Sequence, residues 1–357
     1  MHTDSRPNLF GLDISQLTEL GTELGGPRYL GRQIAEWLYK KDATSFDDMT
    51  NVSASMRGAL DERCVISRPG PQQTAESLDG TKKHLFPVPG GPGRFVEAAS
   101  IPDPPRHTLC LSTQVGCKMG CLFCMTARQG FDQHLDAGQV VGQYASLPER
   151  EAVTNIVYMG MGEPLDNIDA VLRSIDIFTS DWGYGMAPRR ITVSTVGVLP
   201  AMDTLLDRTR VRFALSVHTP FAEQRRSLMP VELVHPLEDV VERLKERSED
   251  DVRRISVEYI VFDGYNNTRA HANELARLLN GLNTRVNLIR FHEIPGSPLR
   301  TASHDTMLEF QSLLKAKGLQ TTIRKSRGQD IQAACGLLST KALAAAAAAE
   351  SGEEKDW

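Results

Sequence analysis

Residues 108–131 read TLCLSTQVGCKMGCLFCMTARQGF, and the cysteine spacing in this stretch decides both the fold and the chemistry. Cys117, Cys121 and Cys124 form a C-x3-C-x2-C motif within eight residues. Three thiols this close together do not suit an ordinary disulfide framework, so metal or redox chemistry is the better interpretation. Three further cysteines lie outside the motif: Cys64, Cys110 and Cys335.

The three-cysteine motif fits an iron–sulfur cluster better than a zinc ion. Thiolates normally hold a four-iron cluster through four cysteines, so three in one loop leave one iron without a protein ligand. The amine and carboxylate of S-adenosylmethionine (SAM) can chelate such an open iron, and the cofactor then supplies the difficult chemistry. Zinc would need a fourth Cys or His at a second paired spacing, and His134 lies in no such pair. Zinc binding and three unconnected core cysteines remain the alternatives.

Short apolar runs alternate with amphipathic runs from His107 onward. This alternation predicts an α/β fold with a parallel sheet, a partial or complete βα barrel, preceded by a small helical domain. The predicted strands cover 107–113, 155–161, 190–195, 212–218, 255–262, 285–291 and 319–324. Three of the predicted helices cover 237–247, 269–279 and 305–318.

Polar or glycine-rich clusters follow the first four predicted strands, where a βα barrel places its active site. The cysteine motif follows the first strand, and Gly162-Glu163-Pro164 follows the second. Ser194 ends the third strand, while Ser216 and His218 end the fourth. The sequence therefore predicts a single site at the carboxyl ends of these strands.

The chain divides into three predicted parts. Residues 1–90 form a helical unit, in which Ile34, Trp37 and Leu38 lie on one face at helical spacing. Residues 91–340 form the barrel core. Residues 341–357, rich in alanine and acidic side chains, form a disordered tail.

Composition limits the class of protein. The 357 residues are 41% hydrophobic and 24% charged, which fits one large or two modest domains. Because the chain shows neither a secretory signal nor a membrane-spanning stretch, we expect a cytoplasmic protein. The net charge of −5 argues against binding nucleic acid by bulk electrostatics, although a local basic face is compatible with it. The candidate basic groups are Lys82–Lys83, Arg189–Arg190, Arg225–Arg226 and the run Arg324–Arg327.

The motifs together resemble one known family. C-x3-C-x-[FY]-C after a first strand is similar to the radical SAM signature, and the Gly162-Glu163 pair is similar to its SAM amine-binding motif. NIVYMGMGEPLDN, ITVSTVGVLPAM, TIRKSRGQDIQAACG and the N-terminal YLGRQIAEWLYKK resemble the RlmN/Cfr family of radical SAM ribosomal RNA adenine methyltransferases. The resemblance covers about residues 8–340, with the motifs in the same order.

The resemblance implies a covalent mechanism through two cysteines outside the cluster motif. Cys335 is similar to the cysteine that accepts a methyl group from one SAM, while the radical from a second SAM takes a hydrogen from that methyl group. The resulting methylene radical adds to an adenine ring carbon. Cys110 is similar to the residue that resolves this protein–RNA crosslink by forming a disulfide with Cys335, and Glu97 to the acceptor of the adenine proton. Such a route suits an electrophilic ring carbon, because covalent attachment divides a difficult step and a nearby base removes the proton.

The resemblance also implies a set of SAM contacts at the ends of the strands. One position departs from the family pattern, because His292 stands where the best-known members have Asn; His can also hydrogen-bond SAM. The implied SAM-binding residues are Gly162, Glu163, Ser194, Ser216, Val217, His218 and His292.

The implied partners are an RNA substrate and an electron donor. Family members act on 23S ribosomal RNA, and some also on transfer RNA; we expect a reductase or flavodoxin-type donor, two SAM molecules per turnover, no membrane contact and a monomer. The overall match favours methylation of carbon 2 of adenine over carbon 8. The alternatives are the carbon-8 reaction, a radical SAM enzyme acting on a protein or peptide, and a non-catalytic iron–sulfur sensor. Only the methyltransferases require Cys110 and Cys335.

Overall fold

A ten-stranded sheet forms the centre of the computed structural model, which describes residues 6–90, 93–247, 255–331, 336–340 and 342–343. The order of its strands is β1 (Gln73–Glu76), β2 (Lys82–Pro87), β3 (Phe95–Asp103), β4 (Arg106–Cys110), β7 (Asn155–Tyr158), β8 (Ile191–Thr195), β9 (Arg212–Ser216), β10 (Ile255–Val261), β11 (Thr284–Arg290) and β12 (Thr321–Ile323). A separate hairpin pairs β5 (Gln114–Gly116) with β6 (Phe131–His134).

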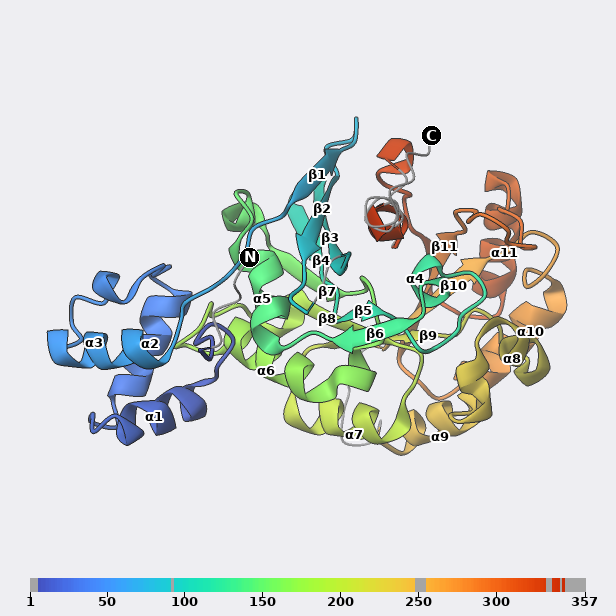
Figure 1. Cartoon of the computed structure of the whole chain (residues 1–357). Coiled ribbons are helices and arrows are strands. Elements are labelled where there is room, and N and C mark those ends of the chain that lie inside the picture. The colour runs from blue at the N-terminus through green and yellow to red at the C-terminus, as the bar shows by residue number, and fades with distance from the viewer. Residues whose placement is uncertain (1–5, 91–92, 248–254, 332–335, 341, 344–357) are drawn as a thin grey trace.

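Helices follow most strands of the sheet. They are α4 (Met125–Arg128), α5 (Ala137–Ala145), α6 (Ile168–Thr179), α7 (Leu199–Arg208), α8 (Ala222–Leu228), α9 (Leu237–Arg247), α10 (Arg269–Leu279) and α11 (His304–Ala316). The N-terminal helices are α1 (Ile14–Glu23), α2 (Leu30–Tyr39) and α3 (Ala54–Arg63). Figure 1 shows the sheet curving in an arc, with helices on its outer side and the N-terminal helices grouped at one end.

The predicted strands and their parallel arrangement are confirmed. All seven coincide with β4 and β7 to β12, and every neighbouring pair in this series is parallel. β1, β2 and β3 extend the sheet by antiparallel pairing onto β4. The predicted fold of parallel βα units is therefore present, with a meander added to one edge.

The two faces of the sheet differ in burial, and β8 shows this clearly. Ile191 and Val193 are fully buried in the main hydrophobic core, together with Met202 of α7. Thr192 and Ser194 alternate with them and are only half-buried. Because side chains alternate between faces along a strand, one face packs on the helices and the other lines a concave interior.

The N-terminal unit is held together by a buried stripe on α2. Ile34 and Leu38, predicted to share one face, are both fully buried. Asp13 caps α1 by accepting a hydrogen bond from the backbone N–H of Gln16 (3.0 Å), and the N–H of Asp13 donates to the side-chain oxygen of Gln16 (3.2 Å). This helical part ends at Arg63, and β1 and β2 already pair into the main sheet before residue 90.

The sheet is a partial barrel, because β1 and β12 are the edge strands in its described order. The chain after β12, residues 324–331, runs back across this opening, and we call it the C-terminal strap. Arg327 forms an ion pair with Asp103 at the end of β3. The N–H of Gly328 donates to the carboxylate of Asp79 in the β1–β2 turn (3.0 Å). The strap therefore links the two edges of the sheet.

In the described ranges, every helix is too short or too polar to cross a membrane. The predicted tail at 341–357 lies outside the described residues, apart from 342–343.

Candidate active site

The three-cysteine motif lies in the loop between β5 and α4, at the carboxyl end of the first barrel strand. The N–H of Cys117 donates to the carbonyl of Gly130 (2.8 Å), which closes the loop at its base. Gly116 has φ = 73°, and a Cβ there would lie 1.8 Å from the Gly130 oxygen. Only glycine fits this position, so the sequence Gly-Cys at the start of the motif sets the loop's shape.

Burial shapes the chemistry of the motif's thiols. Cys117 and Cys121 are buried, whereas Cys124 is half-buried. Burial raises the pKa of Cys117 to about 12, and burial followed by the nearby Cys124 thiol raises the pKa of Cys121 well above its usual range. Thiolates in this loop need a compensating positive charge, which a bound metal centre provides.

The arrangement of these donors fits a cluster. In the part of the chain that the structure describes, no three Cys, His, Asp or Glu side chains converge on a single-ion site. A four-iron cluster with four thiolate ligands spreads those ligands over its irons, so the sulfurs need not meet at one point. Cys117, Cys121 and Cys124 would hold three of the irons.

Glu163 lies buried beside the cluster loop. Its carboxylate accepts backbone N–H bonds from Leu165 and Val196, both at 3.0 Å, and burial raises its pKa to about 7. Its own N–H donates to the side-chain oxygen of Gln114 on β5 (2.8 Å). Gly162 has φ = 95°, and a Cβ there would lie 2.5 Å from the Cβ of Gln114. The motif is thus packed onto β5, and its buried carboxyl group would be stabilised in the charged form by an ammonium partner.

The serines predicted to bind SAM lie at the ends of adjacent strands. Ser194 is the penultimate residue of β8 and Ser216 the last residue of β9, and both are half-buried. Val217 differs, because its side chain is fully buried in the main core. Its N–H donates to the carbonyl of Glu258 on β10 (3.0 Å). Its carbonyl accepts the N–H of Thr219 (2.8 Å), so both backbone polar groups of Val217 already have a partner within the protein.

His218 is held in an unusual backbone conformation against the cluster loop. Its φ is 58°, in the left-handed region that non-glycine residues rarely adopt. Its Nδ1 accepts the N–H of Ile260 (3.0 Å), so the neutral ring carries its proton on Nε2. Burial lowers its pKa to about 3, and its ring meets that of Phe123 edge-on at 4.8 Å. The amide of Asn266 donates to the His218 carbonyl (2.6 Å), which helps to hold this conformation.

Arg225 is a site residue that sequence reasoning missed. It is fully buried, forms an ion pair with Glu232, and donates to the carbonyls of Val196 (2.9 Å) and Ser216 (3.3 Å). It therefore joins the loops that follow β8 and β9. The prediction that Arg225 and Arg226 form a surface basic pair is wrong for Arg225, and no signal in the sequence separates the two.

Replacing Arg225 by methionine is expected to destabilise the protein by about 3–5 kcal/mol, because Glu232 would be left as an unpaired buried charge. Urea denaturation measures this change. Arg226→Met is the matched control: Arg226 is half-exposed and pairs with Glu223 at 3.4 Å, so its loss should cost at most about 1 kcal/mol. Equal small effects of both substitutions would contradict the structural role of Arg225.

Two family profiles match the chain. Residues 111–278 match the radical SAM superfamily, and residues 7–66 match the ribosomal RNA large subunit methyltransferase N-terminal domain. A dual-specificity RNA methyltransferase RlmN from Syntrophus aciditrophicus is 42% identical over 347 residues, which cover 96% of this chain and 99% of that protein. The chain belongs to the RlmN family.

Further relatives agree with this membership of the RlmN family. A protein of Porphyromonas gingivalis, described as a probable dual-specificity RNA methyltransferase RlmN, is 48% identical over 97% of this chain and 99% of its own length. The crystal structure of a radical SAM methyltransferase from Sphaerobacter thermophilus is 37% identical, with a TM-score of 0.85 over 92% of this chain and 98% of that one. The fold class is confirmed, and radical SAM membership implies a [4Fe-4S] cluster and SAM.

Cys110, which the RlmN/Cfr resemblance assigns to crosslink resolution, is buried on β4. It lies opposite Ala99 of β3 and opposite Val157 of β7. Ala99 also lies opposite Lys83 of β2, so these side chains form one row across the sheet. Cys335 lies outside the described residues.

Glu97 lies two residues before Ala99 and so shares its face of the sheet. Its carboxylate accepts from the Nζ of Lys83 (2.8 Å), the N–H of Gly336 (3.0 Å) and the N–H of Ser339 (2.6 Å). Gly336 directly follows Cys335 in the sequence. The residue assigned as proton acceptor thus already binds the segment that follows the assigned methyl acceptor.

His292 is the second residue after β11, at the carboxyl edge where the other predicted SAM contacts lie. It is half-buried, and burial followed by the charge of Arg290 lowers its pKa. Like the side-chain amide of Asn, a neutral imidazole offers both a hydrogen-bond donor and a hydrogen-bond acceptor.

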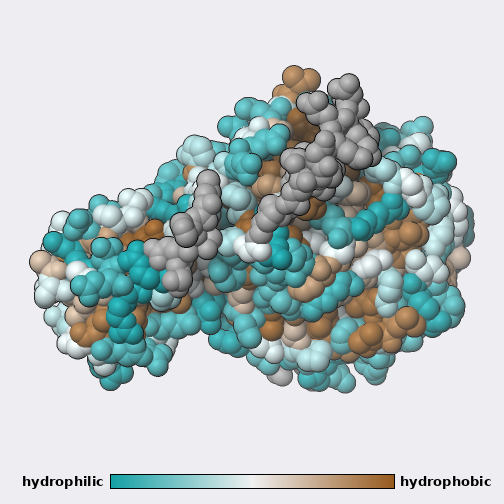
Figure 2. All heavy atoms as spheres, viewed as in Figure 1, coloured by the Kyte–Doolittle hydropathy of each residue, from teal (hydrophilic) through white to brown (hydrophobic). Residues whose placement is uncertain are grey.

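The basic groups divide between surface and interior. Lys83 and Arg225 are buried, which corrects the prediction that their pairs form surface patches. Exposed basic side chains remain at Arg189, Arg190, Arg324 and Lys325. Figure 2 shows hydrophilic residues over most of the visible face, with hydrophobic groups between them.

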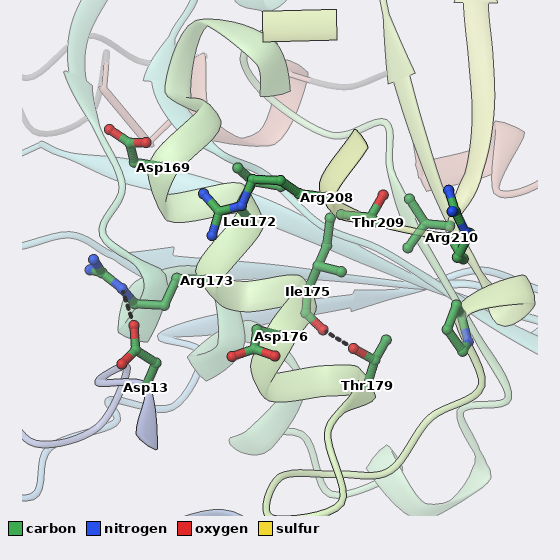
Figure 3. Close-up of a pocket in the computed structure, with 12 residues that line it drawn as sticks. Asp13, Asp169, Leu172, Arg173, Ile175, Asp176, Thr179, Arg208, Thr209 and Arg210 are labelled. Carbon is green, nitrogen blue, oxygen red and sulfur yellow. Dashed lines mark hydrogen bonds and ion pairs between the residues drawn. The ribbon is translucent and has the colours of Figure 1, made fainter. Parts of the chain in front are cut away.

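A surface hollow on the helical side lies away from this site (Figure 3). Residues of α6 and of the segment that begins at Arg208 line it. Arg173 of α6 forms an ion pair with Asp13 before α1 (3.4 Å). The hollow therefore marks a junction between the N-terminal unit and the core.

Proposed function

We propose that this chain methylates carbon 2 of an adenine in 23S ribosomal RNA, and in transfer RNA, using two SAM molecules per turnover. The observation that carries the proposal is the binding of Gly336 and Ser339 by Glu97. It joins the segment that follows Cys335 to the sheet face that bears Cys110. The names and high coverage of the RlmN relatives support the same reaction.

The cluster loop and the Gly162-Glu163 motif would hold the cofactors. When bound, a [4Fe-4S] cluster supplies the electron that cleaves SAM reductively, and Cys117, Cys121 and Cys124 would hold it. Glu163 would accept a hydrogen bond from the SAM amine, while Ser194, Ser216 and His218 would contact its nucleoside part. His292 would reach the same ligand from the end of β11. Glu163 and His218 are buried away from water, which strengthens their hydrogen bonds to a charged ligand.

Two cysteines would carry the methyl group and release the product. The Cys335 sulfur would take a methyl group by nucleophilic displacement. After that methyl group loses a hydrogen atom, its carbon, still bound to the Cys335 sulfur, would form the bond to the adenine carbon. Cys110 would free the methylated RNA by forming a disulfide with Cys335. In the described ranges, no disulfide joins Cys64, Cys117, Cys121 or Cys124.

Glu97 would take the proton from the adenine carbon. A base must lie within hydrogen-bond reach of that proton, and Glu97 has two oxygens that already accept three donors. A carboxylate has about four acceptor sites, so Oε1, which accepts only from Ser339, would have one left for the adenine proton.

RNA recognition would combine backbone contacts with an extruded base. The target adenine must leave its stack to reach a buried site, at a cost of a few kcal/mol that is smaller in a loop. The N-terminal unit and the exposed Arg189, Arg190 and Lys325 would bind phosphates, whereas Arg324 pairs with the buried carboxylate of Glu258 (3.3 Å). We place the reaction in the cytoplasm, with a monomeric enzyme and a flavodoxin-type or reductase electron donor.

Label transfer tests the proposed function. Reconstituted, reduced enzyme is incubated with methyl-labelled SAM and either a 23S ribosomal RNA fragment, a transfer RNA or a control RNA lacking the target adenine. Label should enter the first two RNAs and not the control. Cleavage of SAM without label in any RNA would instead favour a protein or peptide substrate.

A further inference from the structure

Lys83 is a buried lysine that the proposed reaction does not use. It is 1% exposed on β2, and its Nζ lies 2.8 Å from the Oε2 of Glu97, which is 4% exposed. Lysine is almost never fully buried unless it is paired, because removing its charge from water is costly. A buried position also excludes Lys83 as a phosphate contact. The Lys83–Glu97 ion pair must therefore have a role inside the protein.

The partner of this ion pair is a turn in the C-terminal segment. Glu97 accepts N–H bonds from Gly336 and Ser339, so both carboxylate oxygens are engaged. Gly336 has φ = +88°, and a Cβ there would lie 2.8 Å from the backbone nitrogen of Thr126 in α4. The turn is thus packed directly onto the helix that follows the cluster loop.

Gln129 holds the same turn from the other side. Its side-chain amide donates to the carbonyl of Gly336 (2.8 Å) and to the hydroxyls of Ser339 (2.9 Å) and Thr340 (2.6 Å). Gln129 directly follows the last residue of α4, a helix that begins immediately after Cys124. The segment 336–340 therefore bridges β3 and the cluster-bearing loop.

We propose that Lys83 and Glu97 form a latch that fixes residues 336–340 against α4, with Lys83 as a positioning residue. Lys83 orients the carboxylate so that both of its oxygens can accept backbone N–H groups of the turn. Resting on the proposed function, the latch sets where the chain that follows Cys335 lies relative to the cluster loop. Misplacement by about 1 Å can slow a reaction a hundredfold, so such a latch would control turnover.

The rate of amide hydrogen exchange in residues 336–343 measures directly whether the latch holds this segment. The N–H of Ser339 lies in the first turn of a short helix, where it has no partner within the helix, and Glu97 accepts it. In Lys83→Met, exchange in peptides covering 336–343 should accelerate about tenfold or more. RNA methylation should fall about tenfold or more, while iron content stays unchanged.

Lys82→Met is the matched control. Lys82 neighbours Lys83 on the same strand but points to the other face, where it lies 4.0 Å from Glu76 with its side chain partly exposed. Its loss should change neither exchange in 336–343 nor methylation. If Lys83→Met also left this exchange unchanged, the latch would be disproved, even if activity fell.

A second variant covers the case in which Lys83→Met does not fold. Lys83→Met combined with Glu97→Gln removes both charges, so no unpaired charge is buried and folding should be retained. Fast exchange in 336–343 is expected again, and wild-type exchange would overturn the proposal. Because exchange needs no substrate, a wild-type enzyme that methylates no RNA would refute the proposed function while leaving the latch to be judged by exchange.

Discussion

Replacing Cys335 by alanine is expected to abolish methyl transfer to RNA while leaving the cluster intact. Under the proposed mechanism the methyl group reaches adenine only through the Cys335 sulfur, so its loss should lower methylation by at least about 10³-fold. Label transfer from SAM to RNA measures the effect, and iron content reports the cluster. RNA methylation that survives in Cys335→Ala would contradict a covalent route.

Substitutions of Cys110 and Cys64 extend this experiment. In Cys110→Ala the first steps should proceed but the crosslink should not be released, so a covalent protein–RNA adduct should accumulate and be visible on a denaturing gel. Cys64→Ala is the control, because Cys64 is a buried cysteine at the end of α3, in the N-terminal unit. It should methylate normally and form no adduct. Normal methylation by Cys110→Ala would remove Cys110 from the mechanism.

Replacing Cys121 by alanine is expected to abolish both cluster binding and SAM cleavage. Cys121 is buried in the loop, and two remaining thiolates cannot hold the cluster that three hold with one open iron. Iron content and the yield of 5′-deoxyadenosine from SAM should both fall to background. This pattern differs from that of Cys335→Ala, which should keep its iron.

Cys64→Ala again provides the comparison for Cys121→Ala. It should retain the iron and the visible absorbance of the wild-type protein. Full iron content and SAM cleavage in Cys121→Ala would show that the C-x3-C-x2-C motif does not bind the cluster.

The parallel core of the fold was predictable because its strands are short runs rich in apolar side chains, separated by amphipathic segments. β10 illustrates this, since Val257, Tyr259 and Val261 are fully buried and alternate with residues of the concave face. The meander of β1 to β3 was harder to assign, because turn-rich sequence separates its strands. The C-terminal strap was not predictable, because its contacts join residues more than 200 positions apart, such as Arg327 and Asp103.

Parts of the candidate site were predictable from motifs, and others depend on tertiary packing. The Gly162-Glu163 pair lies beside the cluster loop, as its spacing after the second strand predicts. Nothing in the sequence distinguishes Lys83 from Lys82, since only the fold buries one of two adjacent lysines. Asn266 could not be identified either, because its role is to hold the backbone of His218, 48 residues away.

Mass spectrometry of nucleosides from treated RNA tests the central claim most directly. Wild-type enzyme, reduced and supplied with SAM, should convert one adenosine of a 23S ribosomal RNA fragment into 2-methyladenosine, and a transfer RNA substrate should yield the same nucleoside. Synthetic 2-methyladenosine and 8-methyladenosine serve as chromatographic standards. Formation of 8-methyladenosine, or of no methylated adenosine in either RNA, would contradict the account.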